Sequence, residues 1–532
     1  MSLSPIPLYL HLLVLLLSAI LILSHYSAKA TSKSGHHKIA LSDVISISSG
    51  DLEHVQGIVE KLNLLRDSSN AELPEPWTSK GRTPKSIQCV REGKNQEKCK
   101  PGSVVVPQFV QDMMRLQQHD LQFQKNLDDV QLLGTHNSHI DLAHNYGVMQ
   151  HDLSLLVELV QPHQAIQISN QWLSIRDQMN MGIRMLELDI HWLYGSVRIC
   201  HAGGVHLERL NKIIEWLEKT LHITIHFDSE TIGCFSPKDT TAREALQEIR
   251  TWLDENKDEI IVVMFDDQED LKRWDKVHVL NEFIESTVAE VVFTPSEKDL
   301  HFPDHWPSMK QLVDSNKRLI LTTIADFGNE TRPYMFVRDT EVWKEADAVD
   351  HFEGFPKCEP KLQPGEHNKN VTLFRLNSAA LWYANFYKED NWISPELLRE
   401  IQKCPDKNII SMELVTPELV SAAVWSFREE DWNPKQGGFI YMDSVTKTWK
   451  LDVNGKTKRR HACKQTGIVS SMDTHWVLSQ GEGSFVDQQC PPGFEFALPS
   501  NALENFLVQQ LIEDAGTWLA GEIKAESGTL KI

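Results

Sequence analysis

The sequence predicts an α/β fold in which parallel strands alternate with helices and close into a barrel. Several short runs, such as residues 130–133 and 260–265, are apolar without interruption. Such runs are typical of parallel strands, because helices cover both faces of a parallel sheet. Segments with helical spacing separate the runs. About seven strand–helix units in roughly 300 residues favour a closed barrel over an open sheet.

The expected elements alternate along the central part of the chain. Helices are expected where apolar residues recur every three or four positions, and strands where they are continuous. The expected helices cover residues 109–127, 166–179, 207–221, 242–255, 277–291 and 395–402. The expected strands cover residues 130–133, 183–188, 197–200, 260–265, 318–324 and 409–414.

The chain divides into four expected parts. Residues 1–30 are a signal peptide or an uncleaved signal anchor, because residues 12–23 are almost wholly apolar but short for a bilayer span. Residues 31–125 form a polar N-terminal extension, residues 126–430 the barrel, and residues 431–532 a small appendage.

Short segments rich in Trp, Gly and turn residues predict that the appendage is β-rich. Residues 501–523 are expected to form an amphipathic helix, since Asn501 and Glu504 have the spacing of a capping box. We expect the appendage to pack on the barrel as a structural cap. A glycan- or lipid-binding module is the alternative.

Composition and charge narrow the classes of partner. The chain has 532 residues, of which 41% are hydrophobic and 24% charged, as is ordinary for a globular protein. Its formal net charge of -21 argues against a nucleic-acid partner and against simple electrostatic attraction to anionic lipid.

The cysteines indicate an oxidising compartment, because eight of them follow an apolar leader. Spacing alone does not determine how they pair. The favoured pairs are Cys89–Cys99, Cys200–Cys234 and Cys463–Cys490; the alternative for Cys200 and Cys404 is that they are buried thiols.

Two glycosylation sequons, at Asn329 and Asn370, agree with entry into the secretory pathway. The expected location is therefore extracellular or lumenal, with attachment to a membrane if the leader is an uncleaved anchor.

Polar residues stand at or near the ends of four expected strands. The C-terminal ends of parallel barrel strands meet at one mouth, where such folds keep their chemistry. These residues are, in chain order, His136, Asn137, Glu187, Asp189, His201 and Asp266.

Each of these residues also has a plainer explanation. Glu187 and Asp189 are two positions apart and point to one face of a strand, where they could simply pair with Arg184 or Arg198. Asp266 could cap the helix that follows it. We favour a shared site, because chance does not readily give polar residues at four strand ends together.

The residue types in this set suit the cleavage of a phosphodiester. Two histidines, His136 and His201, can act as a base and an acid near neutral pH. The oxygen ligands suit a hard cation, Ca²⁺ or Mg²⁺. Such a cation can activate a hydroxyl and neutralise charge on the phosphoryl oxygens.

The motifs resemble the X-domain of phosphatidylinositol-specific phospholipases C. The stretch Leu-Gly-Thr-His-Asn-Ser at residues 133–138, the Glu-x-Asp at residues 187–189 and the Cys-His at residues 200–201 carry the resemblance. It covers roughly residues 126–430 and is closest to the secreted and lumenal branch that has only the X-domain. The resemblance implies a distorted (β/α)8 barrel, the TIM-barrel type.

The resemblance also implies roles for the site residues. His136 and His201 correspond to the two catalytic histidines, and Arg184 is a weaker candidate for substrate binding. Metal-independent relatives have an arginine where this chain has Asp189, so a bound metal is expected: Ca²⁺, with Mg²⁺ as the alternative. The implied metal ligands are Asn137, Glu187, Asp189 and Asp266; the last stands where the family has a glutamate, and Asp267 is the alternative for that position.

The expected function is that of a phospholipase C-like phosphodiesterase acting on a phospholipid at a membrane surface. The inositol 2-hydroxyl would attack phosphorus, with the two histidines as acid and base. One alternative is a glycerophosphodiester or sphingomyelinase D-like phosphodiesterase, and another is a non-catalytic secreted binding protein on the same barrel.

Overall fold

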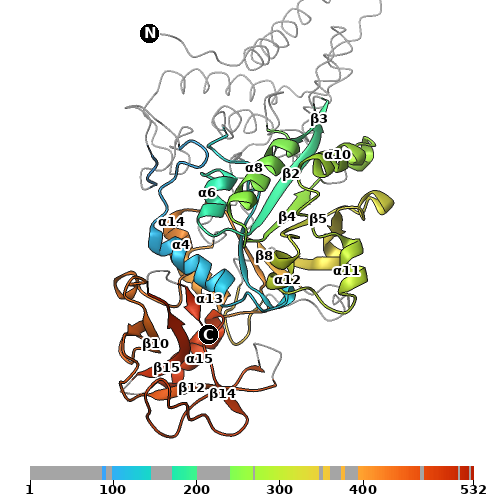
Figure 1. The fold of residues 1–532 in the computed structure, drawn as a ribbon. Helices are drawn as coiled ribbons and strands as arrows, with labels where there is room; N and C mark the ends of the chain where they lie inside the picture. The colour runs from blue at the N-terminus through green and yellow to red at the C-terminus, as the bar shows by residue number, and fades with distance from the viewer. Residues whose placement is uncertain are drawn as a thin grey trace, which may run out of the picture. The chain divides into compact units, whose positions relative to one another are not determined.

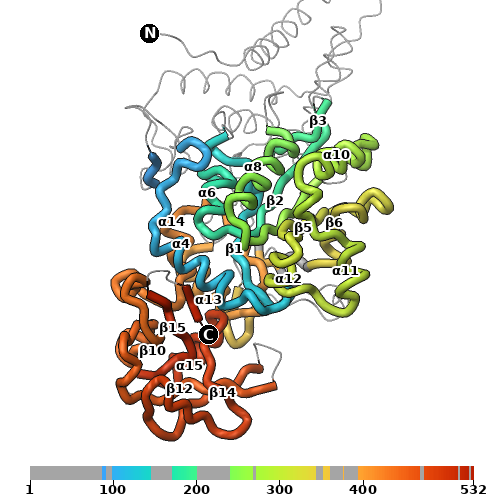
Figure 2. Tube along the Cα trace, in the orientation of Figure 1, coloured from blue at the N-terminus to red at the C-terminus, as the bar shows by residue number. Residues whose placement is uncertain are grey.

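The computed structural model describes the chain in segments, drawn in colour in Figures 1 and 2. All of them belong to one compact unit, Pro74–Ile532. The described residues are 87–90, 99–144, 170–193, 195–200, 240–267, 270–346, 352–359, 373–377, 393–467, 473–512, 516–525 and 529–531.

A nine-stranded sheet forms the centre of this unit, and its main path is parallel throughout. Neighbouring strands follow the order β6-β5-β4-β2-β1-β9-β8-β7, with β3 paired to β2 off the path. The bounds are β1 Leu132–Thr135, β2 Met185–Leu193, β3 Ser196–Ile199, β4 Ile261–Asp266, β5 Leu319–Thr323, β6 Met335–Val337, β7 Trp343–Ala346, β8 Leu373–Asn377 and β9 Ile409–Met412.

The predicted α/β class is confirmed, and the parallel sheet has the form of a partly closed barrel. Within the described residues β6 and β7 are not paired, so the path is open between them. Helices lie around the sheet in Figure 1. They are α4 Gln108–Arg115, α6 Ile175–Asn180, α8 Ala242–Glu255, α9 Asp270–Arg273, α10 Val277–Thr287, α11 Pro295–His301, α12 Met309–Asp314, α13 Pro395–Gln402 and α14 Pro417–Ser421.

Strand β2 is longer than expected, which changes where its acidic residues stand. The strand continues to Leu193 and turns back into β3, which pairs with it antiparallel. Glu187 and Asp189 therefore lie inside β2, and the expected strand at residues 197–200 does not belong to the parallel path. Hydrophobic pairing between Ile190 and Ile199, both buried, accounts for the extension.

A second sheet, which is mixed, follows the parallel sheet in the chain. It corresponds to the β-rich appendage that the sequence predicts. Its order is β11-β10-β15-β12-β13, with β14 paired to β12 and β16 to β15. The bounds are β10 Gly438–Met442, β11 Trp449–Asp452, β12 Arg460–Gln465, β13 Trp476–Leu478, β14 Phe494–Phe496, β15 Thr517–Ile523 and β16 Leu530–Lys531.

The single helix expected over residues 501–523 is wrong in its second half. Helix α15 covers Ala502–Leu511, with the Asn501 side chain accepting from the Glu504 backbone N–H at 2.9 Å. Strand β15 then begins after Gly516, which has a φ of +72°. Trp518 is completely buried where β15 pairs with β10 and β12, and this sheet pairing overrides the helical spacing.

The second sheet and α15 contact the segment that leads out of the parallel sheet. The Trp449 indole donates to Asn505 Oδ1 at 2.8 Å, and the Asn505 amide donates to the Trp425 carbonyl at 2.9 Å. The Trp432 indole donates to Asp112 Oδ2 on α4, also at 2.8 Å. The domain boundaries given above remain a proposal, since one hydrophobic cluster runs through both sheets.

Disulfide bonds join Cys89 to Cys99, Cys463 to Cys490 and Cys358 to Cys404. The third pair was not expected, because its partners are 46 residues apart and meet only when α13 folds beside the turn at Cys358. Cys200 is also disulfide-bonded, so the buried-thiol alternative for Cys200 and Cys404 is wrong. Cys234 lies outside the described residues.

Of the expected leader and the two glycosylation sequons, only the sequon at Asn329 lies within the described residues. Asn329 is exposed in the short 3-10 segment Gly328–Glu330, whereas residues 1–30 and Asn370 lie outside the described residues. Among the helices that the structure describes, none has the length and apolar character needed to cross a bilayer.

Glu504, near the N-terminal end of α15, forms a buried ion pair with Lys464. Its Oε1 accepts from Lys464 Nζ at 2.8 Å, and its Oε2 accepts from the backbone and hydroxyl of Ser500 at 2.8 and 2.9 Å. Burial opposes its ionisation, but the charges of Lys125 and Lys464 outweigh burial and hold the pKa of Glu504 below its usual value.

Replacing Glu504 with glutamine is expected to reduce the free energy of unfolding by about 3 kcal/mol, because it removes one partner of a buried pair. Since the folded-state pKa is below the unfolded value of 4.5, this stabilisation is present above pH 4.5 and is lost as pH falls through the folded value. Urea unfolding at pH 7 and in steps below pH 4.5 measures it. The exposed Glu495→Gln is the control, and a wild-type-to-variant difference that stays constant with pH would contradict the expectation.

Candidate active site

The end of β1 holds His136 against the end of β9. The register pairs Thr135 with Met412, so the next residue on each strand, His136 and Glu413, stand side by side. His136 Nδ1 is hydrogen-bonded to Glu413 Oε1, and Gln171 Nε2 donates to the His136 carbonyl at 2.8 Å. Glu413 is buried, so the imidazole has a fixed carboxylate partner on one side.

Hydrogen bonds join the end of β1 and the turn after it to β2 and to helix α6. Ser138 N donates to the Glu187 carbonyl at 2.7 Å, and Thr135 Oγ1 donates to Gln178 Oε1 at 2.7 Å. Asn137 has a φ of +43°, in the left-handed region that asparagine adopts more readily than most residues. These bonds aim the free edge of the His136 ring toward β2.

Strands β2 and β4 bring three carboxylates together beside His136. Asp189 and Asp266 are register partners on the two strands, and Glu187 lies two residues earlier on the same face of β2. Glu187 Oε2 is 3.9 Å from His136 Nε2, and Asp189 Oδ1 pairs with His191 Nε2 at 2.8 Å. Asp266 Oδ1 is buried without a hydrogen-bond partner in the described structure.

The carboxylates of the cluster are buried and close together, and this arrangement raises the pKa of two of them. Burial and the charges of Asp189 and Glu187 raise the pKa of Asp266 to about 8. Burial also raises the pKa of Asp189, although the neighbouring His191 partly offsets it. At His136 burial favours the neutral ring, but the charges of Glu187 and Glu413 outweigh it and raise the pKa to about 10. His136 is therefore protonated at neutral pH.

Arg375, on β8, supplies a second buried cation to the cluster. Its Nη2 forms an ion pair with Glu187 Oε2 and donates to Ser411 Oγ at 3.0 Å, while Nη1 lies 3.4 Å from Met264 Sδ. The Arg375 side chain is fully buried. It holds one oxygen of Glu187 and lowers the pKa of that carboxyl against the opposing effect of burial.

Sequence reasoning missed Glu413 and Arg375. Glu413 directly follows an apolar run, the same signal that pointed to Asp266, but it was counted inside the expected strand at residues 409–414. Arg375 had no local signal, because its partner Glu187 is 188 residues away in sequence.

The remaining predicted site residues are not brought into this cluster by the described structure. His201 lies outside the described residues, so its role stays a prediction. Arg184 lies just before β2, where its guanidinium donates to Glu259 Oε2 at 2.9 Å and to the carbonyls of Met179 and Ile183. These contacts occupy the Arg184 guanidinium, and its substrate-binding role also stays a prediction.

The donors in the cluster fit a hard divalent cation. Glu187, Asp189 and Asp266 offer carboxylate oxygens, and the Asn137 amide uses its N–H on Asn170, which leaves its oxygen for a cation. Asp266 Oδ1 has no hydrogen-bond partner among the described residues, and burial and its neighbouring carboxylates raise the pKa of Asp266. A bound cation would offset this repulsion between buried acids. The ion pairs of Glu187 with Arg375 and of Asp189 with His191 use carboxylate oxygens that a cation would also bind.

Comparisons with known proteins relate part of this chain to phosphatidylinositol-specific phospholipases C. Residues 208–380 match the family model for the PI-PLC X domain, described as "PI-PLC X 1". Over 221 residues the chain is 23% identical to "PI-PLC X domain-containing protein 1" of Arthroderma benhamiae, which covers 39% of this chain and 60% of that protein. Part of the chain is therefore similar to PI-PLC X domain-containing proteins.

A second relative adds information on location only. The chain is 22% identical over 200 residues to an "Uncharacterized secreted protein" of Arthroderma benhamiae, covering 37% of this chain and 36% of that protein. The matches thus span less than two thirds of either relative's length. The matched family residues begin at residue 208, so the match does not include residues 136–201, and the roles proposed for those residues rest on the motif resemblance and the geometry.

Solved structures of bacterial enzymes are similar in part. The phosphatidylinositol-specific phospholipase C from Listeria monocytogenes is 14% identical, with a TM-score of 0.34, and the match covers 60% of this chain and 97% of that one. The calcium-dependent phosphoinositol-specific phospholipase C from Pseudomonas sp. is 10% identical, with a TM-score of 0.28, covering 56% and 93%.

Proposed function

We propose that this protein is a phosphodiesterase of the phosphatidylinositol phospholipase C type. The observation that carries the proposal is the position of His136, held by Glu413 on one side and facing Glu187 on the other. Three carboxylates and a buried arginine stand within the same cluster. This combination of fixed cations and hard oxygen donors suits a reaction in which negative charge grows on phosphoryl oxygens.

His136 acts mainly as a positive hydrogen-bond donor in this proposal. Its Nδ1 is held by Glu413, and its raised pKa keeps Nε2 protonated at neutral pH. Nε2–H then donates to a phosphoryl oxygen, while a carboxylate of the cluster accepts the proton of the inositol 2-hydroxyl. Arg375 adds a second fixed positive charge close to Glu187.

A divalent cation, Ca²⁺ or alternatively Mg²⁺, would be held by Asn137, Glu187, Asp189 and Asp266. When bound, it supplies Lewis-acid polarisation of the phosphodiester and lowers the pKa of a nearby hydroxyl. Calcium is the first choice because all four expected ligands are oxygen atoms.

His201 is proposed to protonate the departing diacylglycerol oxygen. Attack by a neighbouring hydroxyl then gives two products, a lipid alcohol and a cyclic inositol phosphate. The disulfides and the secreted relative support an extracellular or lumenal location, where the substrate lies in a membrane surface.

An activity panel tests the proposal. Purified protein is mixed with vesicles of phosphatidylinositol, phosphatidylcholine or sphingomyelin, and with glycerophosphodiesters, in Ca²⁺, Mg²⁺ or chelator. We expect headgroup release from phosphatidylinositol in Ca²⁺, and a rate about 10²-fold lower in chelator, since a metal contributes several kcal/mol of charge stabilisation. Release of choline or glycerol instead would favour the sphingomyelinase D-like or glycerophosphodiester alternative. No turnover together with no calcium binding would favour a binding protein.

A further inference from the structure

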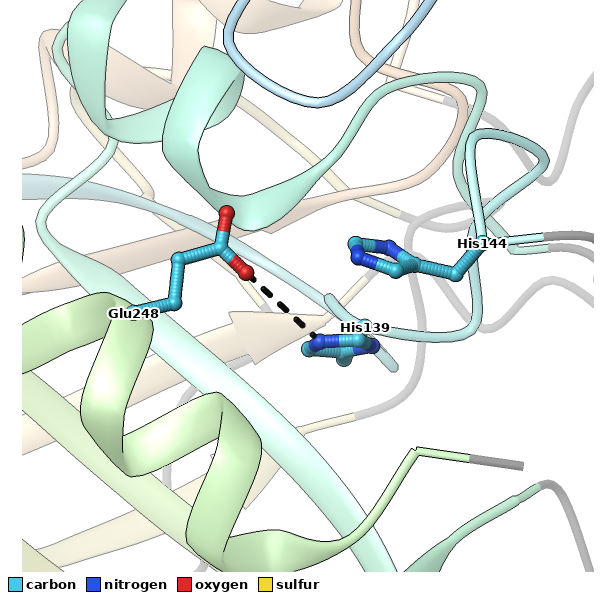
Figure 3. A group of neighbouring side chains, drawn as sticks. All are labelled: His139, His144 and Glu248. Carbon is cyan, nitrogen blue, oxygen red and sulfur yellow. Dashed lines mark ion pairs between the residues drawn. The ribbon is translucent and has the colours of Figure 1, made fainter. Parts of the chain in front are cut away.

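A second group of side chains lies between the turn after β1 and helix α8, outside the carboxylate cluster. His139 and His144 come from the turn, and Glu248 comes from the middle of α8; Figure 3 shows the three side chains pointing toward one another. One ligand atom from each lies within 4.8 Å of the others. Neither histidine nor the glutamate has a role in the proposed phosphodiesterase reaction.

The contacts within this group are not those of a hydrogen-bonded network. His139 Nε2 is 3.8 Å from Glu248 Oε2, which is too long for a hydrogen bond. His139 is 1% exposed, and no hydrogen bond joins its Nε2 to the Glu248 carboxylate.

The separations suit ligands that share one ion. Bonds of about 2.1 Å from a central ion to nitrogen and oxygen ligands place those ligands roughly 3–4 Å apart. The 3.8 Å between His139 Nε2 and Glu248 Oε2 falls in this range. The rings of His139 and His144 lie 4.2 Å apart between centroids, so the second imidazole is equally close.

Asp141 prepares His144 for such a role. Its carboxylate accepts from His144 Nδ1 at 2.9 Å and from the His144 backbone N–H at 2.8 Å. Fixing one ring nitrogen in this way leaves Nε2 as the ligand atom, which is the usual arrangement around metal-bound histidines. His144 and Glu248 keep 21% and 18% of their side chains exposed, which gives an ion a route from solvent.

We propose that His139, His144 and Glu248 form a second metal site, which takes a borderline transition-metal cation of the zinc class. Two imidazoles and one carboxylate favour Zn²⁺ over the hard Ca²⁺ expected at the all-oxygen cluster. The bound ion joins the turn that carries His136 to helix α8. Zinc binding at this site does not depend on the proposed phosphodiesterase activity.

Metal titration of the full chain tests this site. The protein is dialysed against chelator and titrated with ZnCl₂ by calorimetry, and with CoCl₂ while the visible absorption of tetrahedral cobalt is recorded. The wild type is expected to bind Zn²⁺, and Glu248→Gln and His144→Asn are expected to weaken that binding at least ~10-fold, as loss of a metal-site residue does. The controls are Glu255→Gln on the same helix and the exposed His278→Asn, both of which should bind as the wild type does.

Two further measurements keep the site testable if a variant folds poorly. X-ray absorption at the zinc edge of the wild-type protein counts imidazole ligands directly, and two are expected. Asp266→Asn, which alters the carboxylate cluster, should leave zinc affinity unchanged. Zinc affinity that is the same in Glu248→Gln and the wild type, an absorption spectrum without imidazole ligands, or loss of zinc binding in Asp266→Asn would each overturn the proposal.

Discussion

Replacing His136 with alanine is expected to reduce turnover of phosphatidylinositol by ~10²–10⁴-fold, the range that a positioned acid–base group contributes. The substitution removes the Nε2–H donor at the end of β1 and leaves Glu413 buried without its partner. Initial rates on phosphatidylinositol vesicles in Ca²⁺ measure the effect. KM should change little, because the lost interaction strengthens only as charge develops in the transition state.

A matched variant separates this effect from a general loss of structure. His278, exposed on α10, is replaced with alanine in parallel and should keep wild-type activity. Circular dichroism and the unfolding midpoint establish whether His136→Ala is folded. A folded His136→Ala protein with more than about a tenth of wild-type activity would remove His136 from the reaction.

Replacing Glu413 with glutamine is expected to reduce kcat by ~10²-fold or more, because an amide cannot hold a protonated imidazole as a carboxylate does. A similar exchange of the carboxylate behind the catalytic histidine of a serine protease costs about 10⁴-fold. Glu413 does not face the phosphodiester in this account and is a positioning residue, so a drop in rate alone would not distinguish its role from a structural one.

The pH profile supplies that distinction. The Glu413 charge is one of the causes that raise the pKa of His136 to about 10. Removing that charge lowers the pKa, so the protonated ring is lost at lower pH. The alkaline limb of kcat should therefore move to lower pH in Glu413→Gln, whereas the exposed Glu396→Gln should keep the wild-type limb. An unmoved alkaline limb would mean that Glu413 does not act through His136.

Elements with strong local signals could be predicted to the residue. Helix α8 starts after Thr241, whose side chain and Glu244 form a capping box, and it covers the residues expected. Helix α13 has Ser394 as its N-cap and proline at its first position, and it too has the expected bounds. Residues 517–523 could not be predicted in this way, because the buried strand partners of Trp518 outweigh their helical spacing.

In the candidate site, too, the residues marked by a local pattern could be predicted, whereas those that depend on long-range sheet pairing could not. The rule that polar residues follow parallel strands identified His136 and Asp266 correctly as neighbours of strand ends. It could not show that β2 runs on into a hairpin with β3, which places Glu187 and Asp189 inside a strand. Nor could the rule find Arg375. Its ion pair with Glu187 forms only because the sheet places β8 three strands away from β2.

We propose that residues of β2, together with residues at the ends of β1, β4 and β9, form one site that cleaves an inositol phospholipid by attack of its own hydroxyl. Phosphorus NMR of the products in the phosphatidylinositol vesicle assay with Ca²⁺ tests this claim most directly. The account predicts that the signal of a cyclic inositol phosphate appears first and accumulates as the lipid signal falls. Direct formation of a phosphomonoester, with no cyclic signal at any time, would contradict it.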